Sequence, residues 1–183
     1  MDKGAEYYRR FLDGDEGAIG DIMDELFFKL VFFVDRFVHD VHTAEDIALD
    51  VMSDLFVHKH RYDFRSSLKT YLFMRGRSRA IDWIRHRKAS AATELTEAAG
   101  VPDERTDLEE KLLSDERKRT VGAAVDKLPE DMRTAVHLVF FEEMSYAEAA
   151  SVMKKNRKQI DNLLYRAKKE LYAILGDEGR QLL

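Results

Sequence analysis

Apolar side chains recur every three or four residues along the first half of the chain, which is the pattern of amphipathic helices. Between residues 16 and 38 they cover much of the circumference, so a helix buried on most sides is predicted there. A second helix is predicted near residues 43–60, with Thr43 as its N-cap. The first stretch holds five phenylalanines at helical spacing beside aliphatic residues, and we interpret them as core packing rather than a ligand pocket.

A basic helix and an acidic linker are predicted next. Residues 61–67 interrupt the apolar pattern, and a third helix is predicted to begin near Ser66 or Ser67 and to run to about Arg87. One face of this helix is apolar and the other is almost wholly basic. Residues 89–107 are small, polar and acidic, include glycine and proline, and show no sustained apolar period. They are predicted to form a flexible linker.

Helical periodicity resumes in residues 108–183, where two helix starts are marked by capping pairs. Ser145 and Glu148 form an S-x-x-E capping box, and Asn156 and Gln159 form the analogous arrangement eleven positions later. A short helix, a tight turn and a longer helix result. This order predicts a helix-turn-helix.

These patterns predict an all-α protein with two small helical domains, residues 1–88 and 108–183, joined by an acidic linker over residues 89–107. The chain has only two prolines and nine glycines among its 183 residues, so few positions interrupt helices. Each domain has a size at which a helical bundle is possible but only marginally stable by itself.

The formal net charge of −5 conceals separate blocks of charge. Residues 1–60 hold 6 basic and 14 acidic side chains, whereas residues 61–88 hold 9 basic and 2 acidic ones. Residues 89–116 hold 2 basic and 9 acidic side chains, and residues 154–169 hold 7 basic side chains against Asp161. Both basic blocks fall on predicted helices, so each is a candidate surface for an anionic polymer.

The second basic block carries side chains suited to duplex DNA. Arginine and lysine can donate to guanine, glutamine and asparagine can pair with adenine, and aspartate can accept from cytosine. Flanking cations would hold phosphates. A cationic helix can also be no more than a solvated face, but the paired caps favour DNA contact. The candidate residues are Lys155, Arg157, Lys158, Gln159, Asp161, Asn162, Tyr165 and Arg166.

The first basic block interleaves aromatic and cationic residues. Aromatic faces stack on unpaired bases while cations follow the backbone, so this mixture suits single-stranded or melting DNA better than intact duplex. Tyr71 and Phe73 are expected to pack in the core. Phe64, in the loop, and the arginine face remain candidates for an exposed binding surface.

Several chemistries are not predicted. The chain has no cysteine, so it can form neither a disulfide nor a cysteine-ligated zinc site, which fits a reducing cytoplasm. The histidine pair at 39/42 falls at a predicted turn, the pair at 58/60 would point to different helix faces, and no further ligand cluster is evident, so no metal is expected. No nucleophile triad, phosphate loop or catalytic acid pair stands out, so no enzyme, cofactor or small-molecule substrate is predicted. No secretion signal or apolar run of about 20 residues is present, and a cytoplasmic location is expected.

Two segments together resemble a known family. AEDIALDVMSDLF at residues 44–56, followed by SSLKTYLFMRGRSRAIDWIR at 66–85, resembles region two of the extracytoplasmic-function sigma factors. Residues 127–153 and then NRKQIDNLLYRAKKEL at 156–171 resemble their region four. The family's members carry RNA polymerase to promoters and open them. The resemblance implies a sigma factor with promoter DNA and core polymerase as partners.

The resemblance also implies residue roles in the first domain. The helix over residues 44–56 would bind the clamp helices of the polymerase beta-prime subunit. Candidates for that contact are Asp46, Leu49, Asp50, Met52 and Phe56. The loop 61–67 and the following helix would recognise the minus-ten element and hold its non-template strand. Candidates for that contact are Asp63, Phe64, Arg65, Lys69, Arg75, Arg77, Ser78, Arg79 and Arg85.

For the second domain, the resemblance implies that residues 157–166 read the minus-thirty-five element and that the domain contacts the polymerase beta flap. An anti-sigma factor, membrane-linked or soluble, often masks both domains in the family, so this chain could be held at the membrane by such a partner.

Departures from the family pattern fall at five positions. Leu49 stands where glutamine is usual, Tyr71 where tryptophan is common and Ser78 where asparagine is frequent. Asp161 and Lys158 replace the more frequent lysine and glycine of the recognition helix. The promoter sequence therefore cannot be copied from relatives. Two other classes fit parts of the chain: a helix-turn-helix regulator whose first domain dimerises or senses, and a structural helical adaptor.

Overall fold

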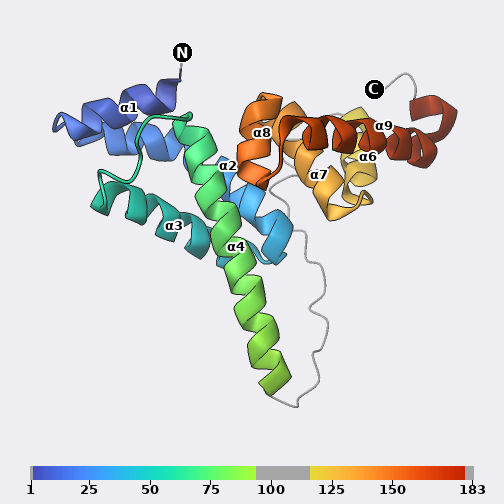
Figure 1. The fold of residues 1–183 in the computed structure, drawn as a ribbon, viewed down its shortest axis with the longest axis horizontal. Coiled ribbons are helices and arrows are strands. Elements are labelled where there is room, and N and C mark those ends of the chain that lie inside the picture. The colour runs from blue at the N-terminus through green and yellow to red at the C-terminus, as the bar shows by residue number, and fades with distance from the viewer. Residues whose placement is uncertain (1, 94–115, 180–183) are drawn as a thin grey trace. The chain divides into compact units, whose positions relative to one another are not determined.

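The computed structural model describes residues 2–93 and 116–179, and every regular element in those ranges is a helix (Figure 1). The all-α prediction is confirmed. The chain divides into two compact units, Met1–Val101 and Pro102–Leu183. Most of the predicted linker and the predicted helix start at residue 108 lie outside the described residues. No described helix has both the length and the apolar character needed to cross a membrane.

In the first unit, helix α2 packs against each of the other three helices. These helices are α1 (Lys3–Leu12), α2 (Gly17–Val38), α3 (Val41–Val57) and α4 (Leu68–Thr93). Phe33 of α2 stacks on Phe73 of α4 with ring centroids 4.6 Å apart, and both side chains are fully buried. Of the clustered phenylalanines, Phe37 is also buried, but Phe28 is 58% exposed, so core packing accounts for only part of the cluster.

Helix α4 packs closely against α2 at Gly76. A Cβ atom at this position would lie 2.7 Å from Cδ1 of Leu30 and 3.2 Å from Cγ2 of Val34. Both neighbours are buried on α2, so neither can move away freely. The absent side chain therefore lets the two helices pack closely, and it limits how α4 can rotate about its own axis.

The ends of α3 and α4 differ from the sequence prediction. Asp40, not Thr43, caps α3: its carboxylate accepts hydrogen bonds from the backbone N–H of His42 and Thr43. Asp40 rather than Thr43 is the N-cap because Asp40 has the extended backbone conformation of an N-cap residue. Its carboxylate also lies within hydrogen-bond distance of both amides. Helix α4 runs to Thr93, so residues 89–93 of the predicted linker are helical. Alanines dominate that stretch and favour continuation of the helix.

Helix α1 was not predicted, although its apolar residues fall at helical spacing. Ala5, Tyr8 and Phe11 are buried against the rest of the unit. Asp2 caps α1 by accepting from the N–H of Ala5, and its second carboxylate oxygen accepts from the N–H of Leu68 at 2.8 Å. One aspartate thus ties the first turn of α1 to the first turn of α4.

The second unit packs its helices around Leu138, Ile160 and Ala167, which are fully buried. Its described helices are α6 (Glu116–Asp126), α7 (Glu130–Val136), the π-helix η1 (His137–Phe141), α8 (Tyr146–Met153) and α9 (Arg157–Gly179). Ala149 and Ala150 of α8 are buried, whereas Ala147 is exposed. A shift of two to three residues around α8 moves a side chain from the solvent face to the buried one.

The π-helix was not predicted either. In an α-helix Phe140 would share a face with Val136, which is buried, but Phe140 is 66% exposed. A π-turn holds more residues than an α-turn and so rotates the side chains that follow it. His137 is buried beneath this turn, with its Nε2 3.5 Å from the Glu142 carboxylate. The turn leaves Phe140 and Phe141 at the surface.

The packing at Gly76 generates a stability prediction. Gly76→Ala should lower the free energy of unfolding of the first unit by about 1–3 kcal/mol, because the new methyl overlaps Leu30. Gly20→Ala is the matched control: it lies on α2 with nothing near its Cβ and should stabilise by up to about 1 kcal/mol. Urea unfolding followed by the fluorescence of Trp83, the single tryptophan, measures both. Equal effects of the two variants would contradict the close packing.

Candidate nucleic-acid interface

The loop between α3 and α4 is held by aromatic packing against α1. Tyr62 is buried, and its ring lies 4.7 Å from that of Phe64. Phe64 adopts a left-handed backbone with φ of 60° and also packs against Tyr8, at 6.0 Å. The Arg9 guanidinium lies 4.8 Å from the centre of the Phe64 ring. Phe64 is therefore half-buried and partly covered by a cation, not a freely exposed loop residue.

Tyr8 anchors the start of the same loop. Its hydroxyl donates to the backbone carbonyls of Leu55, at 3.1 Å, and Lys59, at 2.9 Å. Burial, with a smaller contribution from Tyr71, raises the pKa of Tyr8 to about 12, so the hydroxyl keeps its proton and remains a donor. The end of α3 is thereby fixed to α1.

A pocket of about 360 Å³ opens between α1 and this loop. Its lining residues are Asp2, Ala5, Glu6, Arg9, Tyr62, Phe64, Ser66 and Ser67. They combine aromatic faces, hydroxyls and charges of both signs. Such a pocket can take a small planar group and form hydrogen bonds to its edge.

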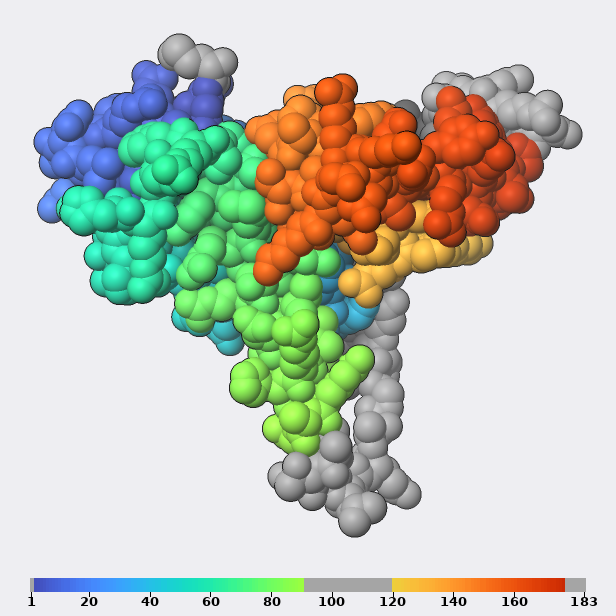
Figure 2. Space-filling model, in the orientation of Figure 1, coloured from blue at the N-terminus to red at the C-terminus, as the bar shows by residue number. Residues whose placement is uncertain are grey.

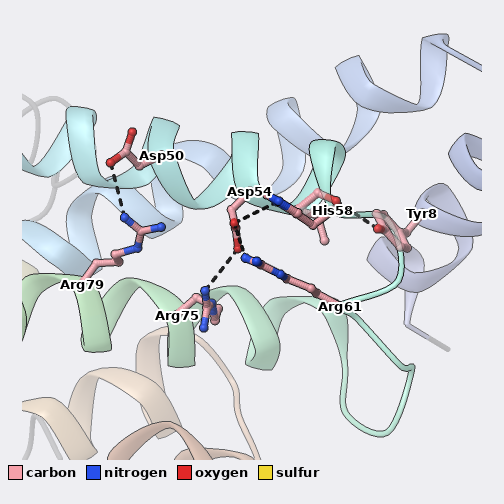
Figure 3. A network of polar contacts seen from close by, with 8 residues as sticks. Tyr8, Asp50, Asp54, His58, Arg61, Arg75 and Arg79 are labelled. Carbon is pink, nitrogen blue, oxygen red and sulfur yellow. Dashed lines mark hydrogen bonds and ion pairs between the residues drawn. The ribbon is translucent and has the colours of Figure 1, made fainter.

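Asp54 of α3 lies at the centre of a charged network that includes the loop and α4 (Figure 3). Its carboxylate accepts hydrogen bonds from Arg61, at 2.5 Å, and from Arg75, at 3.2 Å, and the His58 Nδ1 lies 3.1 Å away. Burial alone would raise the pKa of Asp54, but the hydrogen bond from Arg61 and the charges of Arg61 and Arg75 outweigh it, so the pKa is lowered. Asp54 therefore stays ionised near neutral pH.

One helical turn before Asp54 lies a second and weaker pair. The Asp50 carboxylate is 3.6 Å from the Arg79 guanidinium, and these side chains are 70% and 43% exposed. Figure 3 shows Asp50 and Asp54 on α3 facing Arg79 and Arg75 on α4. The acidic face of α3 and one basic face of α4 therefore run side by side.

The residues expected to contact the polymerase lie on two sides of α3. Asp46, Leu49 and Asp50 are exposed, with Leu49 at 47%. Phe56 is half-buried, and its ring packs edge-on against Phe11 at 5.4 Å. Met52 is only 2% exposed, so the expectation that it contacts a partner is wrong. It lies on the same face as the buried residues that hold α3 against the core.

The candidate residues of α4 do not share one face. Arg75 and Arg79 are one turn apart beside α3, whereas Arg77 is two positions from each and so projects to nearly the opposite side. The Nε atom of Arg77 is buried. Lys69 and Ser78 are half-buried.

Arg85 lies in the later, exposed part of α4. Its side chain is 76% exposed and 3.6 Å from Asp82. The later part of α4 forms the light-green surface in Figure 2, and residues 85–90 are exposed. In the loop, Asp63 accepts from the N–H of Arg65 and also pairs with its guanidinium at 3.1 Å, with both side chains exposed.

The two predicted caps of the helix-turn-helix are confirmed. The Ser145 hydroxyl accepts from the N–H of Glu148, whose carboxylate accepts from the N–H of Ser145 at 3.0 Å. At the start of α9, the N–H of Asn156 donates to Gln159 Oε1 at 2.8 Å, and the N–H of Gln159 donates to Asn156 Oδ1 at 2.9 Å. These reciprocal bonds fix where α8 and α9 begin.

The start of α9 presents most of the predicted duplex-reading set to solvent. Ile160 and Leu164 are buried, and Lys158, Asn162 and Tyr165 lie around the opposite side. The other exposed members of the set are Arg157, Gln159, Asp161 and Arg166. The face is therefore continuous and carries both donors and acceptors.

Two members of this set have other roles in the free protein. The carbonyl oxygen of Gln159 accepts the cap hydrogen bond from Asn156, so two-point pairing with adenine would require this oxygen to accept a second hydrogen bond or to release the cap. Lys155 forms an ion pair with Asp131 of α7 at 3.0 Å and is 25% exposed. Gln159 can contact DNA through its side-chain NH2 group without disturbing the cap. Lys155 can contact a phosphate most strongly after it leaves Asp131.

The family models match both units. Residues 29–90 match Sigma-70 region 2, and residues 118–171 match Sigma-70 region 4. The chain belongs to the sigma-70 family, in its extracytoplasmic-function (ECF) group. Helix α1 lies before the region 2 match, although it forms part of the pocket and braces the loop.

The curated relatives are RNA polymerase sigma factors, and several are named as ECF sigma factors. SigM of Bacillus subtilis is 26% identical over 83% of this chain and 94% of its own length. SigW of the same organism is 27% identical over 90% of this chain and 92% of its own length. Their names agree with the family assignment.

Solved structures share the fold. Sigma factor RpoE of Bartonella quintana, in complex with the anti-sigma factor NepR, has a TM-score of 0.63 at 21% identity, covering 86% of this chain and 96% of its own. CnrH, in complex with the cytosolic domain of CnrY, has a TM-score of 0.62 at 20% identity and covers 94% of each chain.

Asp2, Tyr8 and Asp54 are among the residues of this interface that were not predicted from the sequence, whereas Arg61 lies in the loop assigned to the minus-ten element but was not singled out. A signal existed for Asp54, which continues the spacing of Asp46 and Asp50 by one more turn. Asp2 and Tyr8 act through contacts across the fold, with partners more than 40 residues away. Local periodicity could not reveal those contacts.

The cap at Asn156 generates a second prediction. Asn156→Ala should weaken the first turn of α9 by about 1 kcal/mol, since the N–H of Gln159 loses its acceptor. Asn156→Asp keeps an acceptor and should retain most of the stability. Amide hydrogen exchange at Gln159 measures the local effect. Unchanged protection in the alanine variant would show that the cap contributes nothing.

Proposed function

We propose that this chain binds core RNA polymerase and directs it to start transcription at specific promoters. The observation that carries the proposal is the presence of region 2 and region 4 in one chain and in that order. The first unit would contact the polymerase and the minus-ten element, and the second unit would read the minus-thirty-five element.

The polymerase contact is assigned to the exposed side of α3. Asp46 and Asp50 offer carboxylates, and Leu49 offers an apolar surface between them. We propose that this face binds the clamp helices of the beta-prime subunit, and that the second unit binds the beta flap. Phe56 would contribute at the edge, because its ring is only half-buried.

Strand capture is assigned to the loop and α4. The pocket beside Phe64 would accept an unpaired base of the non-template strand, while Arg65, Arg75, Arg79 and Arg85 hold its phosphates. Opening of the promoter duplex would then be driven by the free energy of binding the non-template strand, because the protein stabilises this strand only when it is unpaired. No covalent step is required, so we propose that the protein has no catalytic activity of its own.

Duplex reading is assigned to the exposed start of α9. Lys158, Asn162 and Arg157 can reach base edges, and Arg166 can hold a phosphate. Because RpoE and CnrH were solved with protein partners named as anti-sigma factor NepR and the CnrY cytosolic domain, we also propose an anti-sigma partner for this chain.

Transcription with purified core polymerase tests the proposal. The protein and core enzyme are mixed with a library of genomic fragments, and the run-off transcripts are sequenced. Start sites that share upstream motifs, present only when both proteins are added, would support the proposal. A helix-turn-helix regulator would bind fragments without directing initiation, and a structural adaptor would do neither.

Substitutions should separate the two activities. Arg157→Glu or Lys158→Glu should weaken promoter binding at least several-fold and reduce the dependence of log affinity on log salt by about one. Polymerase affinity should stay unchanged, because the substituted side chains are outside the proposed polymerase contact. Lys127→Glu, exposed on the same unit, is the charge-matched control.

The reciprocal result is expected on α3. Combined Asp46→Asn and Asp50→Asn should weaken polymerase binding while leaving DNA recognition by the second unit intact. Asp24→Asn, exposed on α2, is the control. Fluorescence anisotropy of labelled protein with core enzyme and with promoter duplex measures both affinities. Equal loss of both affinities in either set would refute the division of labour.

A further inference from the structure

Asp54 connects the helix assigned to the polymerase with the two elements assigned to the DNA strand. It lies on α3, pairs with Arg61 at the start of the loop and pairs with Arg75 on α4. The Asp54 side chain is 12% exposed, whereas Arg61 and Arg75 are 50% and 41% exposed. The carboxylate is thus inside the network, and each arginine keeps an open edge toward solvent.

Two guanidinium groups held this near one carboxylate repel each other. Asp54 offsets that repulsion because each of its oxygens accepts a charge-assisted hydrogen bond: Oδ1 from Arg61 and Oδ2 from Arg75. His58 also contacts Oδ1. Without the negative charge, the arginines would separate, and Arg61 would be free to move with the loop.

The neighbouring pair provides a contrast. Asp50 is 70% exposed and 3.6 Å from Arg79, so water screens this pair and either partner can leave it at little cost. Asp50 can therefore exchange Arg79 for a polymerase residue. Asp54 has no such exposure and stays with its arginines.

We propose that Asp54 is a positioning residue for strand capture: it holds Arg61 and Arg75 together so that both guanidinium groups meet the phosphates of the non-template strand. The inference rests on the proposed function and gives Arg61, within the loop assigned to the strand, a specific phosphate contact. It also separates two carboxylates of one acidic face, with Asp50 serving the polymerase and Asp54 serving the DNA.

The test uses the full chain bound to core polymerase. The ligand is a fluorescent single-stranded oligonucleotide that carries the non-template minus-ten segment of a promoter found by run-off sequencing. Asp54→Asn should weaken oligonucleotide binding on the order of tenfold, the range of couplings between contacting charged residues. Affinity for core polymerase should stay within twofold of the unsubstituted protein. Asp24→Asn is the control for loss of one exposed carboxylate.

A double-mutant cycle separates positioning from a general loss of structure. If Asp54 acts through the two arginines, Asp54→Asn combined with Arg75→Gln should weaken oligonucleotide binding by less than the product of the two single effects, and Asp54→Asn should add no more than twofold when Arg61→Gln and Arg75→Gln are both present. The combination with Arg61→Gln, an exposed position whose change should not unfold the unit, should likewise be less than additive. Asp54→Glu should restore part of the affinity.

Three results would overturn the inference. They are unchanged oligonucleotide binding by Asp54→Asn, fully additive effects in both cycles, and a parallel loss of polymerase affinity that marks a merely structural role. Failure of the unsubstituted protein to bind the oligonucleotide with core polymerase would instead contradict the proposed function itself.

Discussion

The close packing of α4 on α2 at Gly76 determines where the basic residues of α4 can point. The missing side chain lets the helix backbone approach Leu30 and Val34, and the stacked rings of Phe33 and Phe73 support the same contact. With the rotation of α4 limited in this way, Arg75 and Arg79 lie beside α3, and Arg77 is directed elsewhere. The packing of α4 in the core thus determines which of its arginine side chains lie beside α3.

The charges that meet along this side serve both sets of proposed contacts. An exposed carboxylate such as Asp50 is weakly paired and can bind a partner, while the enclosed carboxylate of Asp54 organises the arginines around it. Helix α1 completes the arrangement by capping α4 through Asp2 and by bracing the loop through Tyr8. The side that we propose binds the strand is therefore assembled from α1, the end of α3, the following loop and α4.

Periodicity and capping rules predicted the helices that carry strong local signals, including both caps of the helix-turn-helix and the solvent face of α9. They failed where tertiary contacts decided the outcome. Asp40 displaced Thr43 as a cap, the π-turn exposed Phe140, and Met52 proved to be buried. The pocket lining from α1 and the Asp54 network join residues distant in sequence, so no local pattern could place them together.

The most direct test of the account is permanganate reactivity of thymines in a promoter complex formed with core polymerase. The account predicts that thymines of the minus-ten region become reactive only when the protein and core enzyme are both present, because strand capture needs the first unit bound to polymerase. Unreactive thymines in a complex that binds the promoter stably would contradict it, and so would equal reactivity with core enzyme alone.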